Sequence, residues 1–260
     1  MRATLRSHAG NRAYWRARWD DIPADDGKLN LSRYPGRYAE EVLARTDGPV
    51  LEAGCGAGRV LRCYHDRGRR IVGMDFIPGV LHKIRQADPS IPLVAGDVTR
   101  LAFADASFAV VLAFGLYHNL EQGLDRALAE TRRILRQGGL LCASFRADNL
   151  QNRVIDFLAD RRAAGPGPVH FHKMNYTRSE IESALSRAGL EPLDLHYVEN
   201  MPFLYKVRFL RHPSQRVFDE RHARAEGYRL SAAGKVLQRL LAGPWPEQFC
   251  NVYVYVARAV

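Results

Sequence analysis

The sequence has few cysteines and no long apolar segment. None of its four cysteines belongs to a Cys-x-x-Cys pair or stands at zinc-finger spacing from a histidine, so neither a disulfide framework nor a structural metal is expected. No apolar run approaches the roughly 20 residues that cross a bilayer, and the N-terminal residues show no secretory pattern. We therefore expect a cytoplasmic protein with reduced thiols, no metal and no transmembrane segment.

Lysine is also scarce: it provides five of the 38 basic residues, and arginine provides the rest. The formal net charge is +10, yet the arginines are spread along the chain among acidic residues. No basic stretch is interleaved with aromatic side chains, as in proteins that bind single-stranded nucleic acid. A solvated basic surface is therefore favoured and no nucleic-acid partner is expected, although a modest attraction for an anionic substrate stays open.

Short apolar runs alternate with helical patterns from Pro49 to Arg146, which is typical of a parallel βαβ sheet. The run at 108–114 is almost uniformly apolar, as in a central strand that is covered on both faces. Gly138 and Gly139 are expected to end the helix before the fifth strand. The pattern predicts strands at 49–53, 70–75, 91–95, 108–114 and 140–145, and helices at 58–66, 78–86 and 124–135.

Further elements follow this region. Thr177 and Glu180 form a capping box that opens a predicted helix, and the β-branched and aromatic residues near the C-terminus predict a last strand. The long segment before that strand is expected to form a lid over a substrate. We expect helices at 149–162 and 179–188, strands at 190–198 and 249–257, a helical cap at 1–45, a core at 46–198, a lid insertion at 199–246 and a terminal core strand within 247–260.

Three glycines, Gly54, Gly56 and Gly58, lie between the first predicted strand and the helix after it. Glycine tolerates positive φ and lets the backbone approach a ligand closely. The backbone amides at the N-terminus of the following helix can then donate hydrogen bonds to the ligand. No Gly-Lys-Ser/Thr follows, which excludes a triphosphate loop. The Gly-x-Gly-x-Gly spacing also differs from the dinucleotide fingerprint, so a nicotinamide-dependent reductase is disfavoured.

Three acids stand at successive strand ends: Glu52 before the glycines, Asp75 after the second strand and Asp97 after the third. Because the carboxyl ends of parallel strands meet at one edge, these acids are expected to converge on one crevice. A carboxylate at Glu52 suits a ligand that carries an ammonium and a sulfonium better than a pyrophosphate. Asp75 stands where an acid accepts hydrogen bonds from ribose hydroxyls.

Residues 51–58, 73–77, 95–98, 108–120 and 135–141 together resemble the successive motifs of class I S-adenosylmethionine-dependent methyltransferases. The resemblance implies a doubly wound α/β fold whose seven-stranded, mostly parallel Rossmann-like sheet has an antiparallel last strand. It also implies S-adenosylmethionine as cofactor and S-adenosylhomocysteine as product. Ala109 departs from the family, which often has an acid there. By resemblance, the cofactor contacts are Glu52, Gly54, Gly56, Gly58 and Arg59 at the methionine part, Asp75 at the ribose, Phe76, Asp97 and Val98 at the adenine, and Phe114 near the sulfonium.

Candidate catalytic residues follow the fourth strand, close to the expected position of the methyl group. His118 is the leading candidate for a general base, which a hydroxyl acceptor needs and a neutral amine does not. Its alternative is a structural role at the helix that begins near Glu121. Tyr117 and Asn119 are weaker candidates, as hydrogen-bonding partners of a substrate.

Candidate substrate contacts come from three further segments. Tyr14 precedes the sheet with Trp15 and Trp19, which could close over the cofactor or simply pack a cap helix. His172 alternates with His170 on one face of a strand or extended loop. Tyr205 and Arg208 belong to a segment, 201–212, that interleaves apolar and basic residues. That segment fits an acceptor pocket, a helix packed on the sheet, or contact with a membrane surface.

The favoured function is methyl transfer to a small-molecule acceptor, more readily a hydroxyl than an amine. Sugars, secondary metabolites and lipid-linked precursors are the acceptor classes considered. An RNA or protein methyltransferase is the enzymatic alternative, disfavoured because no Asn-Pro-Pro-Tyr-like turn follows the fourth strand. A catalytically silent cofactor-binding protein is the alternative from another class. The oligomeric state is left open.

Overall fold

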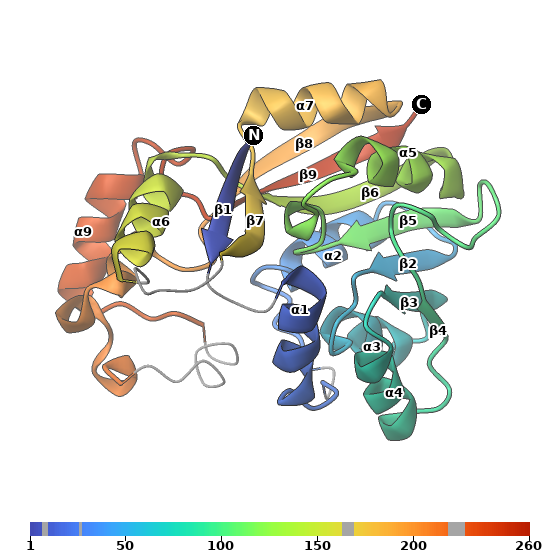
Figure 1. The fold of residues 1–260 in the computed structure, drawn as a ribbon, viewed down its shortest axis with the longest axis horizontal. Coiled ribbons are helices and arrows are strands. Elements are labelled where there is room, and N and C mark those ends of the chain that lie inside the picture. Colours follow the sequence, from blue (N-terminus) through green and yellow to red (C-terminus); the bar gives the residue numbers. More distant parts are fainter. Residues whose placement is uncertain (7–9, 26–27, 163–168, 218–226) are drawn as a thin grey trace.

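Seven strands form one sheet in the order β4-β3-β2-β5-β6-β9-β8 (Figure 1). The neighbouring strands from β4 to β6 are parallel, and β9 is antiparallel to both of its neighbours, β6 and β8. This computed structural model describes residues 1–6, 10–25, 28–162, 169–217 and 227–260. The mostly parallel sheet with an antiparallel last strand is the predicted one. Its strands are β2 (Val50–Ala53), β3 (Ile71–Asp75), β4 (Leu93–Ala95), β5 (Phe108–Ala113), β6 (Leu135–Arg146), β8 (Leu190–Val198) and β9 (Val252–Ala259).

Helices cover both faces of the sheet, which is why β5 is buried along its whole length. The apolar side chains of α5 (Leu124–Ile134) and α7 (Arg178–Arg187) join one core cluster. Those of α2 (Gly36–Leu43), α3 (Arg59–His65) and α4 (Pro78–Ala87) join a second cluster on the opposite face. The doubly wound arrangement leaves the carboxyl ends of the parallel strands open as a binding edge.

Two local expectations met different outcomes. The capping box is present: Thr177 and Glu180 exchange hydrogen bonds at the start of α7. The expected helix end at Gly138–Gly139 is wrong, because α5 ends at Ile134 and β6 begins at once. Leu135 is buried and pairs with Phe108, and the register then shifts so that the glycines lie in an irregular stretch within the strand. Burial of Leu135 in the sheet thus ends α5 before the position that the two glycines predicted.

The N-terminal cap contains a strand as well as helices. Strand β1 (Arg2–Arg6) pairs antiparallel with β7 (His170–Asn175) in a separate two-stranded sheet, and the two ribbons run side by side in Figure 1. Helix α1 (Asn11–Asp20) follows. The expectation of a purely helical cap is therefore corrected: Arg-Ala-Thr-Leu-Arg has no strong local pattern, and its partner strand lies far along the chain.

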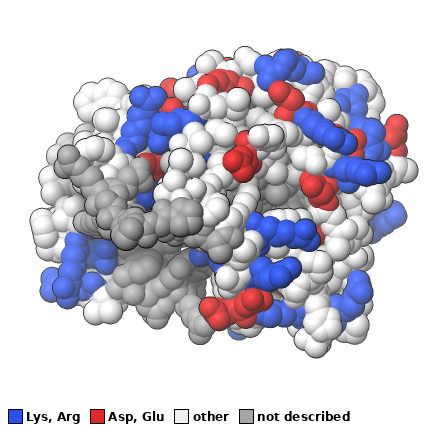
Figure 2. Space-filling model, viewed as in Figure 1, with Lys and Arg blue, Asp and Glu red and all other residues white. Residues whose placement is uncertain are grey.

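The segment expected to form a lid consists, where it is described, of short turns and one helix. The 3₁₀ turns are η2 (Phe203–Lys206), η3 (Arg208–Leu210) and η4 (Pro213–Gln215), and the helix is α9 (Ala232–Ala242). Figure 1 shows α9 and α6 (Leu150–Arg162) on the side of the molecule away from β4. None of the described helices is long and apolar enough to cross a membrane. On the face drawn in Figure 2, basic and acidic side chains are interspersed.

Candidate functional site

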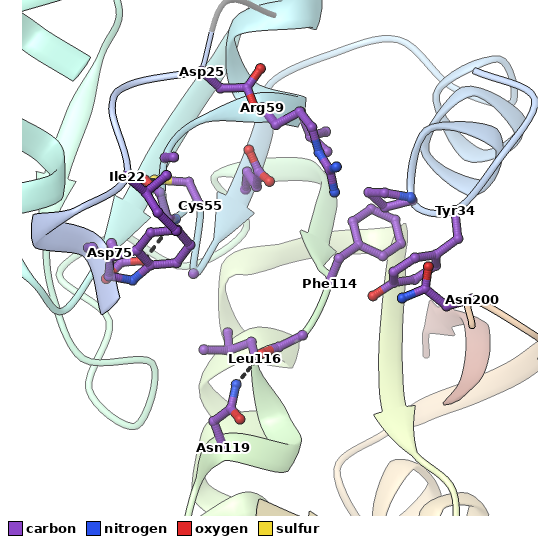
Figure 3. Close-up of a pocket in the computed structure, with 18 of the residues that line it drawn as sticks. Ile22, Asp25, Tyr34, Cys55, Arg59, Asp75, Phe114, Leu116, Asn119 and Asn200 are labelled. Carbon is purple, nitrogen blue, oxygen red and sulfur yellow. Dashed lines mark hydrogen bonds between the residues drawn. The ribbon is translucent and has the colours of Figure 1, made fainter. Parts of the chain in front are cut away.

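A cleft of about 1640 Å³ opens at the carboxyl edge of the parallel strands. A typical small-ligand pocket measures roughly 300–1,000 Å³, so this one has room for a cofactor and an acceptor together. Figure 3 shows side chains from several elements turned toward this space. The predicted site residues that line it are Tyr14, Glu52, Gly54, Gly56, Arg59, Asp75, Phe76, Asp97, Val98, Phe114 and His118, whereas Gly58, Tyr117, His172, Tyr205 and Arg208 do not.

The glycine loop follows β2 with its backbone in the left-handed region. Gly56, at φ +51°, donates its N–H to Asp75 Oδ2 at 2.9 Å. A Cβ there would lie 2.6 Å from the Trp19 ring, so only glycine fits between the ring and the carboxylate. Gly58 has a different role: it is the N-cap of α3, and a Cβ on it would lie 2.9 Å from Ile84 Cδ1. Its left-handed backbone, at φ +83°, favours glycine at the start of α3, where it packs against α4.

Glu52 is buried, with 6% of its surface exposed. Its Oε2 accepts a hydrogen bond of 2.6 Å from the backbone N–H of Leu61, in the first turn of α3. Burial raises the pKa of Glu52 to about 8, opposed by the Leu61 amide and Arg59 and reinforced by Asp75 and Asp25. A cationic ligand in the cleft would offset the cost of keeping this carboxylate ionised. The site is therefore chemically suited to a ligand bearing an ammonium and a sulfonium.

Asp75 and Asp97 line the same cleft as Glu52. Asp75 is buried and accepts from Gly56 N–H on one oxygen and from Ile77 N–H, at 3.0 Å, on the other. Burial raises its pKa, and these amides oppose the shift. A carboxylate has about four acceptor positions, so Asp75 retains capacity for ribose hydroxyls. Asp97 is exposed and accepts from both the N–H and the Oγ1 of Thr99 at 2.8 Å.

A tyrosine that the sequence analysis missed anchors the loop after β5. The Tyr34 hydroxyl and Ser144 Oγ are 3.0 Å apart, and Ser144 Oγ accepts from Gly115 N–H at 2.8 Å. The Tyr34 ring meets Phe114 edge-to-face, with centroids 5.7 Å apart. Figure 3 shows Tyr34, Phe114 and Arg59 projecting toward one space from three separate segments. No local pattern marks Tyr34, because Ser144 is 110 residues away.

The structure places the two candidate catalytic residues in different environments. Tyr117 is fully buried, its hydroxyl is 2.7 Å from Thr131 Oγ1 and its ring stacks on Phe145. The structure thus places Tyr117 in the core, contrary to the expectation of a substrate contact, because the 3₁₀ turn η1 (Tyr117–Asn119) directs it inward. His118 lies at the cleft, 7% exposed. Burial lowers its pKa well below the usual value, with Lys173 and Arg146 adding to the effect. His118 is therefore neutral at neutral pH.

The predicted substrate contacts are only partly brought together. Tyr14 lines the cleft, and the ring of His172 lies edge-on to it, outside the lining, with centroids 5.5 Å apart. Tyr205 is buried against Tyr228 and beneath the Arg211 guanidinium. Arg208 is exposed. The expectation that Tyr205 and Arg208 face the acceptor is therefore not met, because their segment packs on itself and on α9.

Lys83 is a second residue that the sequence analysis missed. Its Nζ donates to the backbone oxygens of Trp19, Asp20 and Ile22, at 2.7, 2.6 and 3.2 Å. An ammonium is favourable at the C-terminus of a helix, where carbonyl groups lack partners. Lys83, on α4, therefore docks the end of α1 on the core and holds Trp19 against the glycine loop.

The central part of this chain is similar to known proteins. A family model described as a methyltransferase domain matches residues 51–143. A demethylmenaquinone methyltransferase of Renibacterium salmoninarum is 41% identical over 123 residues, which make up 46% of this chain and 51% of that protein. Residues 51–143 thus form a methyltransferase domain of the class I, S-adenosylmethionine-dependent type. S-adenosylmethionine is the cofactor of that family, and the acids and glycine loop described above fit it.

Two further similarities are to another curated protein and to a solved structure. A malonyl-[acyl-carrier protein] O-methyltransferase of Serratia marcescens is 33% identical over 103 residues, 39% of this chain and 40% of that protein. A solved S-adenosylmethionine-dependent methyltransferase from Methanosarcina mazei matches with a TM-score of 0.60 at 16% identity, over 89% of this chain and 99% of that one. This second likeness is one of fold. The chain spans about half the length of the curated relatives it matches.

Proposed function

We propose that this protein transfers the methyl group of S-adenosylmethionine to a small-molecule acceptor, preferentially at a hydroxyl oxygen. The observation that carries the proposal is one cleft that holds both the acid-flanked glycine loop and, beyond β5, the buried neutral His118. Bound S-adenosylmethionine supplies a methyl group activated by its sulfonium, so the protein mainly has to position the reactants and exclude water.

The chain's own residues divide this work. Glu52 and Asp75 hold the donor end through the amides that they fix on α3 and at Gly56, and the positive charge of the donor favours the ionised form of Glu52. Tyr34 and Phe114 form an apolar wall beside the loop after β5, which keeps water from the transfer axis. The N-terminal helix α1, docked by Lys83, closes the cleft over the glycine loop.

A hydroxyl acceptor also has to lose its proton, and we propose that His118 accepts it. A neutral imidazole is needed for this role, and the lowered pKa keeps His118 neutral. The Nδ1 atom of His118 is buried and forms no hydrogen bond with any residue that the structure describes. Burial and the nearby cations lower the pKa of His118 and make it a weak base, so its contribution adds to positioning and does not replace it.

Calorimetry with the full chain tests the donor assignment. We expect S-adenosylmethionine and S-adenosylhomocysteine to bind, and NADH not to bind. The variant Gly56→Val should lose donor binding, because its side chain would overlap the Trp19 ring. Binding of NADH in preference to S-adenosylhomocysteine would overturn the proposal.

A methyl-transfer screen on small molecules then tests the acceptor atom. Matched pairs of phenols and anilines are incubated with labelled S-adenosylmethionine, and the methylated products are identified by mass spectrometry. We expect methyl ethers to predominate over methylamines. The name of the Serratia relative, an O-methyltransferase, supports transfer to oxygen; predominant methylation at nitrogen or carbon would contradict the expectation.

A further inference from the structure

The part of the cleft lined by β7 carries a half-buried lysine that the proposed reaction has not used. Lys173, on β7, lines the cleft with Arg18 of α1 and with His118. Its ammonium forms no ion pair and no hydrogen bond with any residue in the described part of the chain. An ammonium held near an apolar interior without a paired carboxylate is costly, so its position needs an explanation.

The neighbours of Lys173 increase this cost. The positive charges of Arg146 and Arg18 both repel its ammonium. Asp156 is the carboxylate that attracts it, yet Asp156 already accepts from Arg2 at 2.9 Å and Arg146 at 2.7 Å.

The second carboxylate in this region is also committed. Asp148 is buried and pairs with Arg2 at 2.8 Å and with Arg153 at 2.9 Å. Two carboxylates thus serve four arginines, Arg6 included, in addition to Lys173. Both carboxylates are therefore already paired with arginines, and neither forms an ion pair with Lys173.

Burial, followed by Arg146 and Arg18, lowers the pKa of Lys173 to about 8. Lys173 is thus still largely protonated at neutral pH, and an anion within about 4 Å would offset both its desolvation and the repulsion. Three carboxylates, Glu52, Asp75 and Asp97, line the same cleft from other elements: the ends of β2 and β3 and the segment after β4. A cationic donor and an anionic acceptor would each meet complementary charge.

We propose that Lys173 binds an oxyanion, a carboxylate or a phosphate, carried by the methyl acceptor, with Arg18 beside it. This inference rests on the proposed function insofar as it identifies the ligand as the acceptor. The anion orients the acceptor so that its nucleophile lies on the His118 side of the cleft. Acceptors without an acidic group are accordingly expected to be poor substrates.

Three probes of similar size test the site on the full chain loaded with S-adenosylhomocysteine: benzoate, phenyl phosphate and benzyl alcohol. We expect one or both anions to bind at least tenfold more tightly than the alcohol, and the stronger one identifies the group as carboxylate or phosphate. Lys173→Met should weaken anion binding about tenfold or more, as expected for a desolvated charge contact, and leave S-adenosylhomocysteine affinity unchanged. Lys235→Met, on the exposed surface of α9, is the matched control.

Equal binding of the anions and the alcohol to the wild type would overturn the inference, as would equal anion binding by Lys173→Met. Failure of S-adenosylhomocysteine to bind the wild type would instead count against the proposed function. A second measurement needs no substitution: with only five lysines in the chain, the ¹³Cε signal of Lys173 can be followed by NMR. The better anion should raise the pKa of Lys173 from about 8 toward the ordinary value near 10.4; an unchanged pKa would exclude the contact.

Discussion

The two ends of the cleft are built in different ways. The donor end comes from consecutive strand–loop units, with Glu52, Gly56, Asp75 and Asp97 all within 46 residues of sequence, and most of its shape is backbone held by buried acids. The acceptor end is assembled from side chains of α1, η1 and β7, such as Lys173. The shape of the donor end depends on local backbone conformation, whereas the shape of the proposed acceptor end depends on the docking of segments that are far apart in the sequence.

Their charges differ as well. Glu52, Asp75 and Asp97 contribute carboxylates to the donor end, and Lys173 and Arg18 contribute positive charge to the proposed acceptor end. Substitutions at one end should therefore affect one ligand and spare the other. Each experiment below either separates the two ends or shows that they act together.

The largest expected effect is at the acceptor end. His118→Ala should lower turnover of a hydroxyl acceptor by about 10²-fold, since the proton acceptor is removed, and leave S-adenosylmethionine affinity near the wild-type value. Steady-state kinetics and calorimetry measure the two quantities. His82→Ala, at an exposed histidine of α4, is the control. Unchanged turnover would assign His118 to structure and remove the chemical distinction between the ends.

The next effect belongs to the donor end. Asp75→Ala should weaken S-adenosylmethionine binding by about 1–3 kcal/mol, because hydrogen bonds to a charged group are lost and Gly56 N–H loses its acceptor. Affinity for the better of the two anionic probes should change little. Asp66→Ala, at an exposed acid, controls for the loss of charge. Equal donor affinity in Asp75→Ala would show that the ribose is held elsewhere.

A pH series tests the electrostatics of the donor end. The pKa of Glu52 in the folded chain, about 8, lies above its ordinary value of 4.5, so the folded state binds more protons between these values. The free energy of unfolding should therefore fall as pH rises from about 5 to 8, by up to about 1.4 kcal/mol per pH unit. Urea unfolding measures this slope, which should be shallower in Glu52→Gln. Identical slopes would mean that Glu52 is ionised throughout.

The smallest effect tests whether the cap belongs to the donor end. Lys83→Met removes three hydrogen bonds to the end of α1, which should weaken S-adenosylmethionine binding by about 0.5–1.5 kcal/mol. Lys235→Met again provides the control. A loss of acceptor affinity without a loss of donor affinity would show that α1 serves the other end.

The contrast between the ends also explains what could be predicted from the sequence. The glycine loop and its three acids were recognisable because each lies at a fixed offset from a predicted strand. Residues that follow parallel strands lie at the carboxyl edge of the sheet, where ligands bind. Gly58 was assigned to the ligand although it packs against Ile84, since the motif does not distinguish a glycine needed by a ligand from one needed by a helix contact.

Residues outside the motif were harder to place. Tyr205 and Arg208 looked like pocket residues by composition, but their segment packs on α9 through contacts such as Leu204 N–H to Gln238. Strand β1 escaped notice because its partner, β7, lies about 170 residues away. Lys173 carried no signal of its own, because its significance lies in which arginines surround it.

The position of β9 constrains how the molecule can fold. Strand β8 is hydrogen-bonded to the sheet through β9, and β9 pairs on its other side with β6. The earlier strands β2 to β6 can associate as their residues become available, but β8 has to wait for residues 252–259. Until then β6 presents an unpaired edge, and such edges favour association with other chains. The slowest and most aggregation-prone stage of folding should therefore be the insertion of this last strand, and it should respond to protein concentration in a way that donor-site variants do not alter.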